Sequence, residues 1–313
     1  MSNEKKPAPH GWLILDKPRG LGSTQAVGAV KRNLREGGYS KTKVGHGGTL
    51  DPLAEGVLPI ALGEATKLAG RMLDASKVYR FTVRFGEETA TLDSEGDVIR
   101  RSDVRPTKAG IQAALSQFIG PIEQVPPAFS ALKVDGKRAY DLARAGQEVT
   151  LKTRKVTVHD LQVDPAACEE EGGTIAEATL TAHVSKGTYV RSLARDIAAV
   201  LGTCGHVTYL RRTKAGPFRE AQAISLDKLN EIGKGAQLQD LLLPLEAGLD
   251  DIPALSLDPA SAQAVRQGRV LAGLPQSSGL YCAMLDTVPV ALVEIDEGTA
   301  KVVRGFNLPD VAE

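Results

Sequence analysis

Two segments of the chain alternate apolar and polar residues, which is the pattern of a β-strand with one buried face. They lie at residues 79–85 and 175–184, and segments with apolar residues at helical spacing lie between and around them. Because strands and helices are interspersed without strict βαβ repetition, we predict an α+β fold, with a mixed, largely antiparallel sheet core flanked by helices. The other predicted elements are a strand at 12–15 and helices at 23–35, 64–73, 107–118 and 190–201.

Residues typical of helix ends mark two of these helices. Ser23 is the predicted N-cap of the first helix, and the glycines at 37 and 38 follow its predicted end. Gly202 is the predicted stop of the helix at 190–201. Residues 41–63 are punctuated by glycine and proline.

The length of 313 residues suits about two domains. A proline-containing stretch occurs at residues 243–253, close to a change in charge. We therefore predict a larger domain over residues 1–250 and a small β-rich domain over residues 251–313.

The formal net charge is zero, but charge is unevenly distributed along the chain. Residues 1–50 carry a net charge of +6, residues 130–160 carry +3 and residues 180–219 carry +6, whereas residues 161–179 carry −5 and residues 220–313 carry −8. Basic segments that are far apart in the sequence can converge into one positive surface, which suits a phosphate-rich partner. Solvated charge scattered over the surface is the alternative.

Several chemistries lack their motifs in this sequence. There is no GxxxxGK[ST] phosphate loop, no GxSxG serine motif, and no HExxH or zinc-deaminase motif, so no metal site is expected. Cys168, Cys204 and Cys282 form no CxxC pair, which suits a reducing compartment. The apolar runs are too short for a membrane helix, and no signal peptide is recognisable. We expect a cytoplasmic protein that makes no membrane contact.

One short stretch is unusual. Residues 45–58 have the sequence GHGGTLDPLAEGVL, in which the carboxylate of Asp51 lies between Leu50 and Pro52. The apolar neighbours limit access of water, and the preceding glycines permit close approach of a bulky substrate. Asp51 is therefore a candidate nucleophile, with an aspartate that merely caps a turn as the alternative.

This stretch closely resembles the motif around the nucleophilic aspartate of the TruB-type pseudouridine synthases, bacterial enzymes that isomerise uridine 55 in the tRNA T-loop. Further segments match in the family's order, so that the resemblance covers roughly residues 10–220. It implies the pseudouridine synthase fold and an isomerase that needs no cofactor. The other matching segments are LDKPRG at 15–20, LGEATK at 62–67, KVYR at 77–80, PAFSALK at 127–133, SKGTYVR at 185–191 and YLRR at 209–212.

By this resemblance, Asp51, Tyr79 and Arg191 are the catalytic residues. Asp51 would be the essential carboxylate, and the planar guanidinium of Arg191 would pair with it and orient it. Tyr79 would stack on the target base and serve in proton transfer. Because alternation places the residue at 79 on the same face as the apolar residues of its strand, a place in the core is the alternative for Tyr79.

The resemblance also assigns substrate binding to His46, Tyr79, Lys186, Tyr189 and Leu210. His46 would enter the T-loop and replace the stacking that is lost when the target uridine flips out. Lys186 and Tyr189 belong to one matching segment. For Leu210, ordinary packing is equally expected.

The implied partner is the T-arm of tRNA, bound by a monomer. The basic segments would line the groove for the T-arm stem, whose shape and phosphates would dominate binding. Residues 123–150 resemble the family's thumb insertion, which closes over the loop. Residues 251–313 resemble the small PUA-like domain that many members carry, but their acidity makes a spacer or stabilising role an equal alternative.

The sequence departs from the family motif at Glu55, where members often carry threonine. We expect Glu55 to face solvent; a glycosidase-like pair of carboxylates with Asp51 is the alternative. Two further alternative functions stay open. One is an RNA-binding or RNA-folding protein that kept the fold, and the other is a synthase acting on a different RNA.

Overall fold

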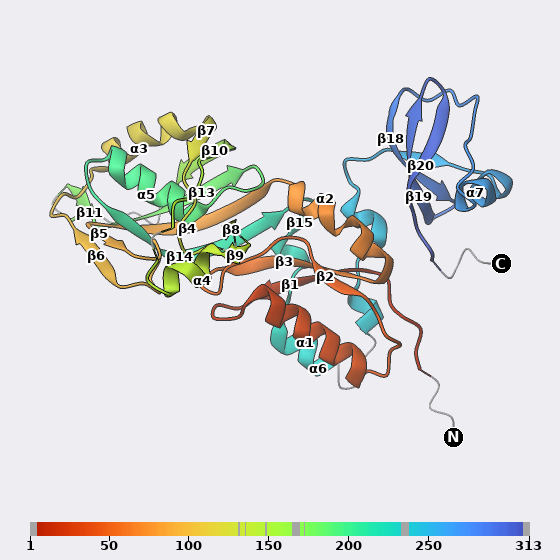
Figure 1. Cartoon of the computed structure of the whole chain (residues 1–313), viewed down its shortest axis with the longest axis horizontal. Coiled ribbons are helices and arrows are strands. Elements are labelled where there is room, and N and C mark those ends of the chain that lie inside the picture. Colours follow the sequence, from red (N-terminus) through yellow and green to blue (C-terminus); the bar gives the residue numbers. More distant parts are fainter. Residues whose placement is uncertain are drawn as a thin grey trace.

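The computed structural model describes residues 5–130, 132–134, 136–147, 149–164, 170–171, 173–232 and 238–308. Cys168 and three positions of the predicted thumb, 131, 135 and 148, lie outside these ranges. Figure 1 shows one long twisted sheet with helices packed against it, and a second, smaller sheet near the C-terminus. The predicted α+β class is confirmed. Within the described ranges, no helix is long and apolar enough to cross a membrane.

The long sheet joins strands that are far apart in the sequence. Its pairings are antiparallel except for β1 with β16 and β14 with β3, as the predicted mixed, largely antiparallel core requires. The strand order is β16 (Ile224–Ser225), β1 (Gly11–Lys17), β3 (Glu55–Leu62), β14 (Gly205–Ala215), β4 (Lys77–Phe85), β13 (Glu177–Val184), β10 (Arg154–Val163) and β7 (Gly120–Gln124). Two short strands extend it, β2 (Val44–His46) beside β3 and β15 (Phe218–Arg219) beside β14.

Helices cover the apolar side of this sheet. Phe81, Val83 and Phe85 alternate along β4 as predicted, and they belong to the same buried cluster as Leu193 and Ile197 of α5 (Val190–Val200). The other helices of the described residues, not all of which pack on this side of the sheet, are α1 (Ser23–Glu36), α2 (Ala69–Asp74), α3 (Lys108–Leu115), α4 (Ala139–Arg144), α6 (Leu226–Ile232) and α7 (Pro259–Arg266). The predicted helix at 64–73 is in fact a 3-10 turn at 63–68 followed by α2.

The predicted N-cap of α1 is wrong by one residue. Gly22 is the N-cap, with an extended backbone, and Ser23 is the first helical residue. The hydroxyl of Ser23 is engaged elsewhere, because it bonds both backbone groups of Leu50.

Residues 41–63 contain two strands that the sequence did not reveal. Glycine and proline punctuate this segment, and β3 is almost wholly buried, so it shows no alternation. Pro59 can lie within β3 because the antiparallel partner β2 reaches only as far as Ile60. Gly56 needs its φ of +99°, and a Cβ there would lie 2.3 Å from the carbonyl oxygen of Arg212.

The smaller sheet is built by the last part of the described chain. Its order is β17 (Ala254–Ser256), β18 (Gly279–Leu285), β19 (Val288–Asp296) and β20 (Thr299–Gly305), and α7 packs against it. A second buried cluster connects this sheet to the long one, since Cys282 and Leu292 share that cluster with Trp12 of β1.

Trp12 lies at the centre of this connection. Its side chain is fully buried, and its indole Nε1 donates a hydrogen bond of 3.0 Å to the carbonyl oxygen of Leu245. The ring centroid lies 5.2 Å from that of Phe218. Gly248 contacts the indole so closely that a Cβ there would lie 2.8 Å from it.

We predict that Trp12→Ala lowers the free energy of unfolding by about 3–5 kcal/mol, because it leaves a large cavity and an unpaired carbonyl. The matched control is Val303→Ala, at a valine of β20 that is 55% exposed. This control should change the free energy of unfolding by less than about 0.5 kcal/mol. Denaturant unfolding of the full chain measures both. Equal effects of the two variants would contradict the role given to Trp12.

Candidate active site

Asp51 lies in the loop between β2 and β3, and Ser23 fixes the backbone of that loop. The Ser23 hydroxyl accepts a hydrogen bond from the Leu50 N–H at 2.8 Å and donates one to the Leu50 carbonyl at 2.9 Å. Both partners are buried. A single side chain therefore satisfies both backbone groups of the residue that precedes Asp51.

Arg212 of β14 holds the same loop from the sheet. Its guanidinium is buried and donates to three carbonyls, those of Val57 at 2.8 Å, Gly48 at 3.1 Å and Thr49 at 3.3 Å. Gly48 has a φ of +135°, which strongly favours glycine. The loop is thus anchored at Gly48, Thr49 and Leu50, immediately before Asp51.

The carboxylate of Asp51 pairs with Arg191, which lies in the first turn of α5. Arg191 Nη2 lies 2.6 Å from Asp51 Oδ2. The arginine side chain is only 6% exposed, whereas that of Asp51 is 41% exposed. Arg191 also donates to the carbonyls of Thr91 at 2.9 Å and Phe129 at 3.0 Å. The guanidinium is therefore committed to fixed partners, and it orients a carboxylate that solvent and substrate can reach.

A second carboxylate, Asp93, lies on the other side of Arg191. Its Oδ2 is 3.1 Å from Arg191 Nη1, and its side chain is 3% exposed. Its other oxygen accepts hydrogen bonds from the Thr91 hydroxyl and from the Glu95 N–H. The turn that places it is strained, because Leu92 has a φ of +62°. Asp93 was not predicted from the sequence, since no motif separates it from the other acids nearby.

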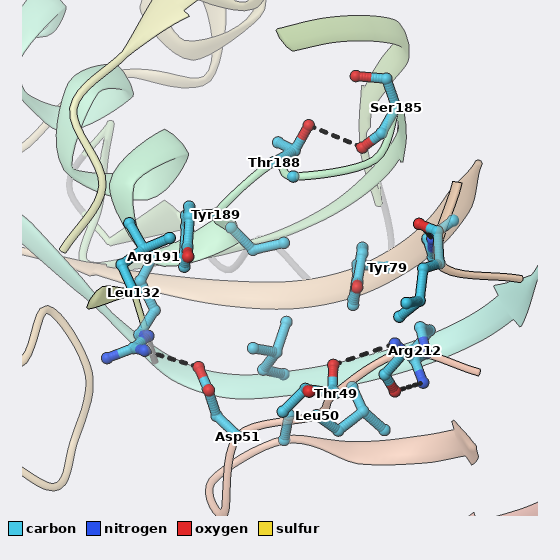
Figure 2. A pocket seen from close by; sticks show the side chains of 17 residues that line it. Thr49, Leu50, Asp51, Tyr79, Leu132, Ser185, Thr188, Tyr189, Arg191 and Arg212 are labelled. Carbon is cyan, nitrogen blue, oxygen red and sulfur yellow. Dashed lines mark hydrogen bonds and ion pairs between the residues drawn. The ribbon is translucent and has the colours of Figure 1, made fainter. Parts of the chain in front are cut away.

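Asp51 and Arg191 line a cavity of about 370 Å³ (Figure 2). Tyr79 of β4 and Leu210 of β14 line it from the sheet, and Tyr189 lines it from the start of α5. Gln124 holds the backbone of Tyr189, accepting from its N–H at 2.8 Å and donating to its carbonyl at 3.1 Å.

The surroundings of the cavity change the pKa of two of its side chains. Burial raises the pKa of Tyr189, so its hydroxyl keeps its proton at neutral pH. Burial and then the nearby Arg212 lower the pKa of Lys77 to about 8. The Lys77 ammonium donates to three carbonyls at the end of α2 and the turn after it.

The structure does not bring His46 and Lys186 into the described lining of this cavity. Lys186 forms an exposed ion pair with Asp74, with Nζ 2.8 Å from Oδ1. His46 lies on β2, and its buried Nδ1 has no hydrogen-bond partner in the described structure. Burial and then Arg212 lower the pKa of His46, so its imidazole is neutral at pH 7.

The expectation that Glu55 faces solvent is wrong. Its side chain is only 27% exposed, and Oε1 lies 3.2 Å from Nη1 of Arg211. The same guanidinium pairs with Asp16 at 3.0 Å and with Glu220. This carboxylate is therefore engaged in a separate ion-pair network, and it is not among the residues that line the cavity with Asp51.

Comparison with known proteins decides the family. Residues 36–190 match the model described as "TruB family pseudouridylate synthase (N terminal domain)", and residues 191–250 match "tRNA pseudouridylate synthase B C-terminal domain". The chain belongs to the TruB family of pseudouridine synthases. All the residues that line the Asp51 cavity fall within these two matched regions.

The relatives of this TruB family member match it over nearly its whole length. A protein of Novosphingobium aromaticivorans named tRNA pseudouridine synthase B is 68% identical, over 97% of this chain and 99% of its own. One of the same name from Zymomonas mobilis is 57% identical, over 96% and 97% of the two chains. A solved H/ACA RNP bound to a substrate RNA containing 2′-deoxyuridine has a TM-score of 0.70 at 25% identity, covering 96% of this chain and 86% of that chain.

We predict that Ser23→Ala slows uridine isomerisation by about tenfold to a hundredfold, because Asp51 loses its fixed position. It should also lower the free energy of unfolding by about 1–3 kcal/mol, since the buried backbone groups of Leu50 lose their partner. Single-turnover kinetics and denaturant unfolding measure the two effects.

The matched control is Thr203→Val. It removes another buried hydroxyl, which donates to the Val104 carbonyl at 2.9 Å and lies outside the Asp51 cavity. This variant should lose comparable stability but keep the wild-type rate. If both variants lose rate in proportion to the stability that they lose, the positioning role of Ser23 is contradicted.

Proposed function

We propose that this chain isomerises uridine 55 in the T-loop of tRNA to pseudouridine, with Asp51 as the essential carboxylate. The observation that carries the proposal is the accessible Asp51 carboxylate, fixed by a buried arginine at the wall of a cavity of about 370 Å³, which has room for a nucleobase. The names of the relatives, tRNA pseudouridine synthase B, support tRNA as the substrate.

The reaction breaks the bond between N1 of uracil and C1′ of ribose, turns the base, and joins its C5 to C1′. It involves no net oxidation and needs no cofactor. The Asp51 carboxylate can act in three ways: it can attack C1′, add to C6, or abstract a proton to form a glycal. Each way needs one carboxylate beside the base. The geometry supports a carboxylate in that place, because Arg191 holds Oδ2 and the side chain remains 41% exposed.

Tyr79, Tyr189 and Leu210 are the side chains that we assign to the uracil ring. All three line the cavity with Asp51, from two strands and the start of a helix. Tyr79 supplies a flat ring for stacking and a hydroxyl for proton transfer. Tyr189 retains its proton and can donate a hydrogen bond, because burial raises its pKa.

His46 suits insertion into the T-loop in place of the flipped uridine. It precedes Asp51 by five residues and ends β2, the strand that leads into the Asp51 loop. A neutral imidazole stacks between bases without bringing a charge, and the lowered pKa of His46 favours that form. We assign Lys186 to the RNA backbone at the rim, where it is exposed.

The thumb segment links RNA binding to the catalytic pair. The Phe129 carbonyl accepts a hydrogen bond from Arg191, and the centroid of the Phe129 ring lies 5.8 Å from that of Tyr140 in an edge-to-face contact. Leu132 of the same segment lines the Asp51 cavity. Closure of the thumb over a bound T-arm would therefore act directly on the site. We keep the domain division predicted from the sequence and propose that residues 1–250 form the catalytic domain and residues 251–313 an accessory domain.

Tritium release tests this function, because C5 of the target uridine loses its hydrogen when it bonds to C1′. We predict that wild type releases tritium from a [5-³H]uridine-labelled tRNA transcript, whereas Asp51→Ala releases none. Asp251→Ala, which removes an exposed aspartate that pairs with Arg71, should behave as wild type. A transcript in which the T-loop target uridine is replaced by cytidine should release no tritium.

Binding of the transcript without tritium release by wild type would contradict an isomerase. It would favour the RNA-binding alternative. Release that persists from the cytidine-containing transcript would show action on a different uridine.

A further inference from the structure

Gln124, the last residue of β7, is a buried amide that does not line the Asp51 cavity. Its side chain is 1% exposed. Oε1 accepts a hydrogen bond from the Tyr189 N–H at 2.8 Å, and Nε2 donates one to the Tyr189 carbonyl at 3.1 Å. Rotating the amide by half a turn would place donor against donor and acceptor against acceptor. The two bonds therefore hold the side chain in one orientation.

Tyr189 needs an outside partner because of its place in the chain. It is the N-cap of α5, with an extended backbone at φ −98° and ψ 109°, and its own side chain does not cap the helix. Its carbonyl accepts a hydrogen bond from the Leu193 N–H at 3.0 Å. A carbonyl oxygen has two lone pairs, and Gln124 takes the second one. The Gln124 amide thus fixes the residue at which the loop turns into α5.

The contact with Gln124 is made by the backbone of Tyr189, while Tyr189 itself lines the Asp51 cavity. A shift of that backbone therefore carries the phenol ring with it. Arg191 is different, because its guanidinium has partners of its own in Asp51 and Asp93. Loss of the Gln124 amide should consequently displace Tyr189 more than Arg191.

Gln124 itself lies on a firm base. On one side β10 pairs with β7, and Arg154 is the partner of Gln124 in that register. On the other side the carbonyl of Val125 accepts hydrogen bonds from Ser192 Oγ at 2.8 Å and from Arg195 Nη2 at 3.2 Å. The end of β7 is thus tied both to the sheet and to the first turns of α5.

We propose that Gln124 is a positioning residue for uridine isomerisation and that it acts through Tyr189. By fixing the backbone of Tyr189, it sets the place where the phenol ring meets the uracil ring. This inference rests on the proposed function, and it adds to that function a residue outside the cavity lining. A residue that only stabilised the fold would leave the chemical step unchanged.

The test uses Gln124→Met, which removes both hydrogen bonds but keeps a side chain of similar length. Tyr189→Ala removes the side chain through which Gln124 is proposed to act, and a double variant combines the two changes. The matched control is Asn33→Leu, at a buried amide of α1 that lies outside the cavity lining and donates to the Ala29 carbonyl at 3.0 Å. Single-turnover rates at saturating tRNA, dissociation constants for tRNA and denaturant unfolding midpoints are measured for every variant.

We expect Gln124→Met to slow the chemical step by about tenfold to a hundredfold, because the Tyr189 ring loses its fixed position. The dissociation constant for tRNA should stay within about threefold of wild type, since phosphate contacts dominate RNA binding. Asn33→Leu should lower the unfolding midpoint comparably but keep the rate within about twofold of wild type. In the Tyr189→Ala background, Gln124→Met should slow the reaction by less than about threefold.

Three results would overturn the proposal. Equal slowing by Gln124→Met in the two backgrounds would show that its effect bypasses Tyr189. A wild-type rate for Gln124→Met, or equal slowing by Asn33→Leu, would leave Gln124 with a stabilising role only. A loss confined to the dissociation constant would show an effect on RNA binding and none on the chemical step.

Hydrogen exchange tests the contact independently of activity. In protein labelled with ¹⁵N-tyrosine, the Tyr189 amide is one of six tyrosine signals, and its absence from Tyr189→Ala identifies it. We expect this amide to exchange about tenfold or more faster in Gln124→Met and at the wild-type rate in Asn33→Leu. Unchanged exchange in Gln124→Met would overturn the contact. If wild type isomerises no uridine, the proposed function fails, and the exchange rate alone decides whether Gln124 fixes Tyr189.

Discussion

The ion triad of Asp51, Arg191 and Asp93, built around a buried guanidinium, is the interaction on which the rest of the site depends. A guanidinium that is 6% exposed is costly to bury unless its charge and its N–H groups are satisfied. Two carboxylates and the carbonyls of Thr91 and Phe129 satisfy them. One arginine thus joins α5, the Asp51 loop, the turn at residues 89–97 and the base of the thumb.

The long sheet provides the frame in which this triad can act. Pairing of β14 with β3 and β4 brings Arg212 under the Asp51 loop and places Leu210 and Tyr79 on the walls of one cavity. Ser23 of α1 also fixes the loop, through Leu50. The carboxylate is therefore positioned before substrate binds. Charged groups that are already in place lower the activation barrier, because the protein does not have to rearrange during the reaction.

The limits of prediction from sequence follow from the same physics. Alternation identified β4 and β13 because each has one buried and one polar face, whereas β3 is buried almost throughout and has no such signature. Asp51 was recognised from a local motif. Asp93 was not, because its role depends on a strained turn at Leu92 and on an arginine 98 residues away in sequence. Such long-range pairing leaves no local pattern.

We infer that Asp93 acts through Arg191 to hold Asp51. A double-mutant cycle with Asp93→Asn, Arg191→Lys and the double variant tests it, using the single-turnover rate of pseudouridine formation in tRNA. We expect the double variant to be about as slow as the slower single variant, because both substitutions disable one unit. Rate losses that multiply in the double variant would show that Asp93 and Arg191 have independent roles, and Asp93 would then not act through Arg191.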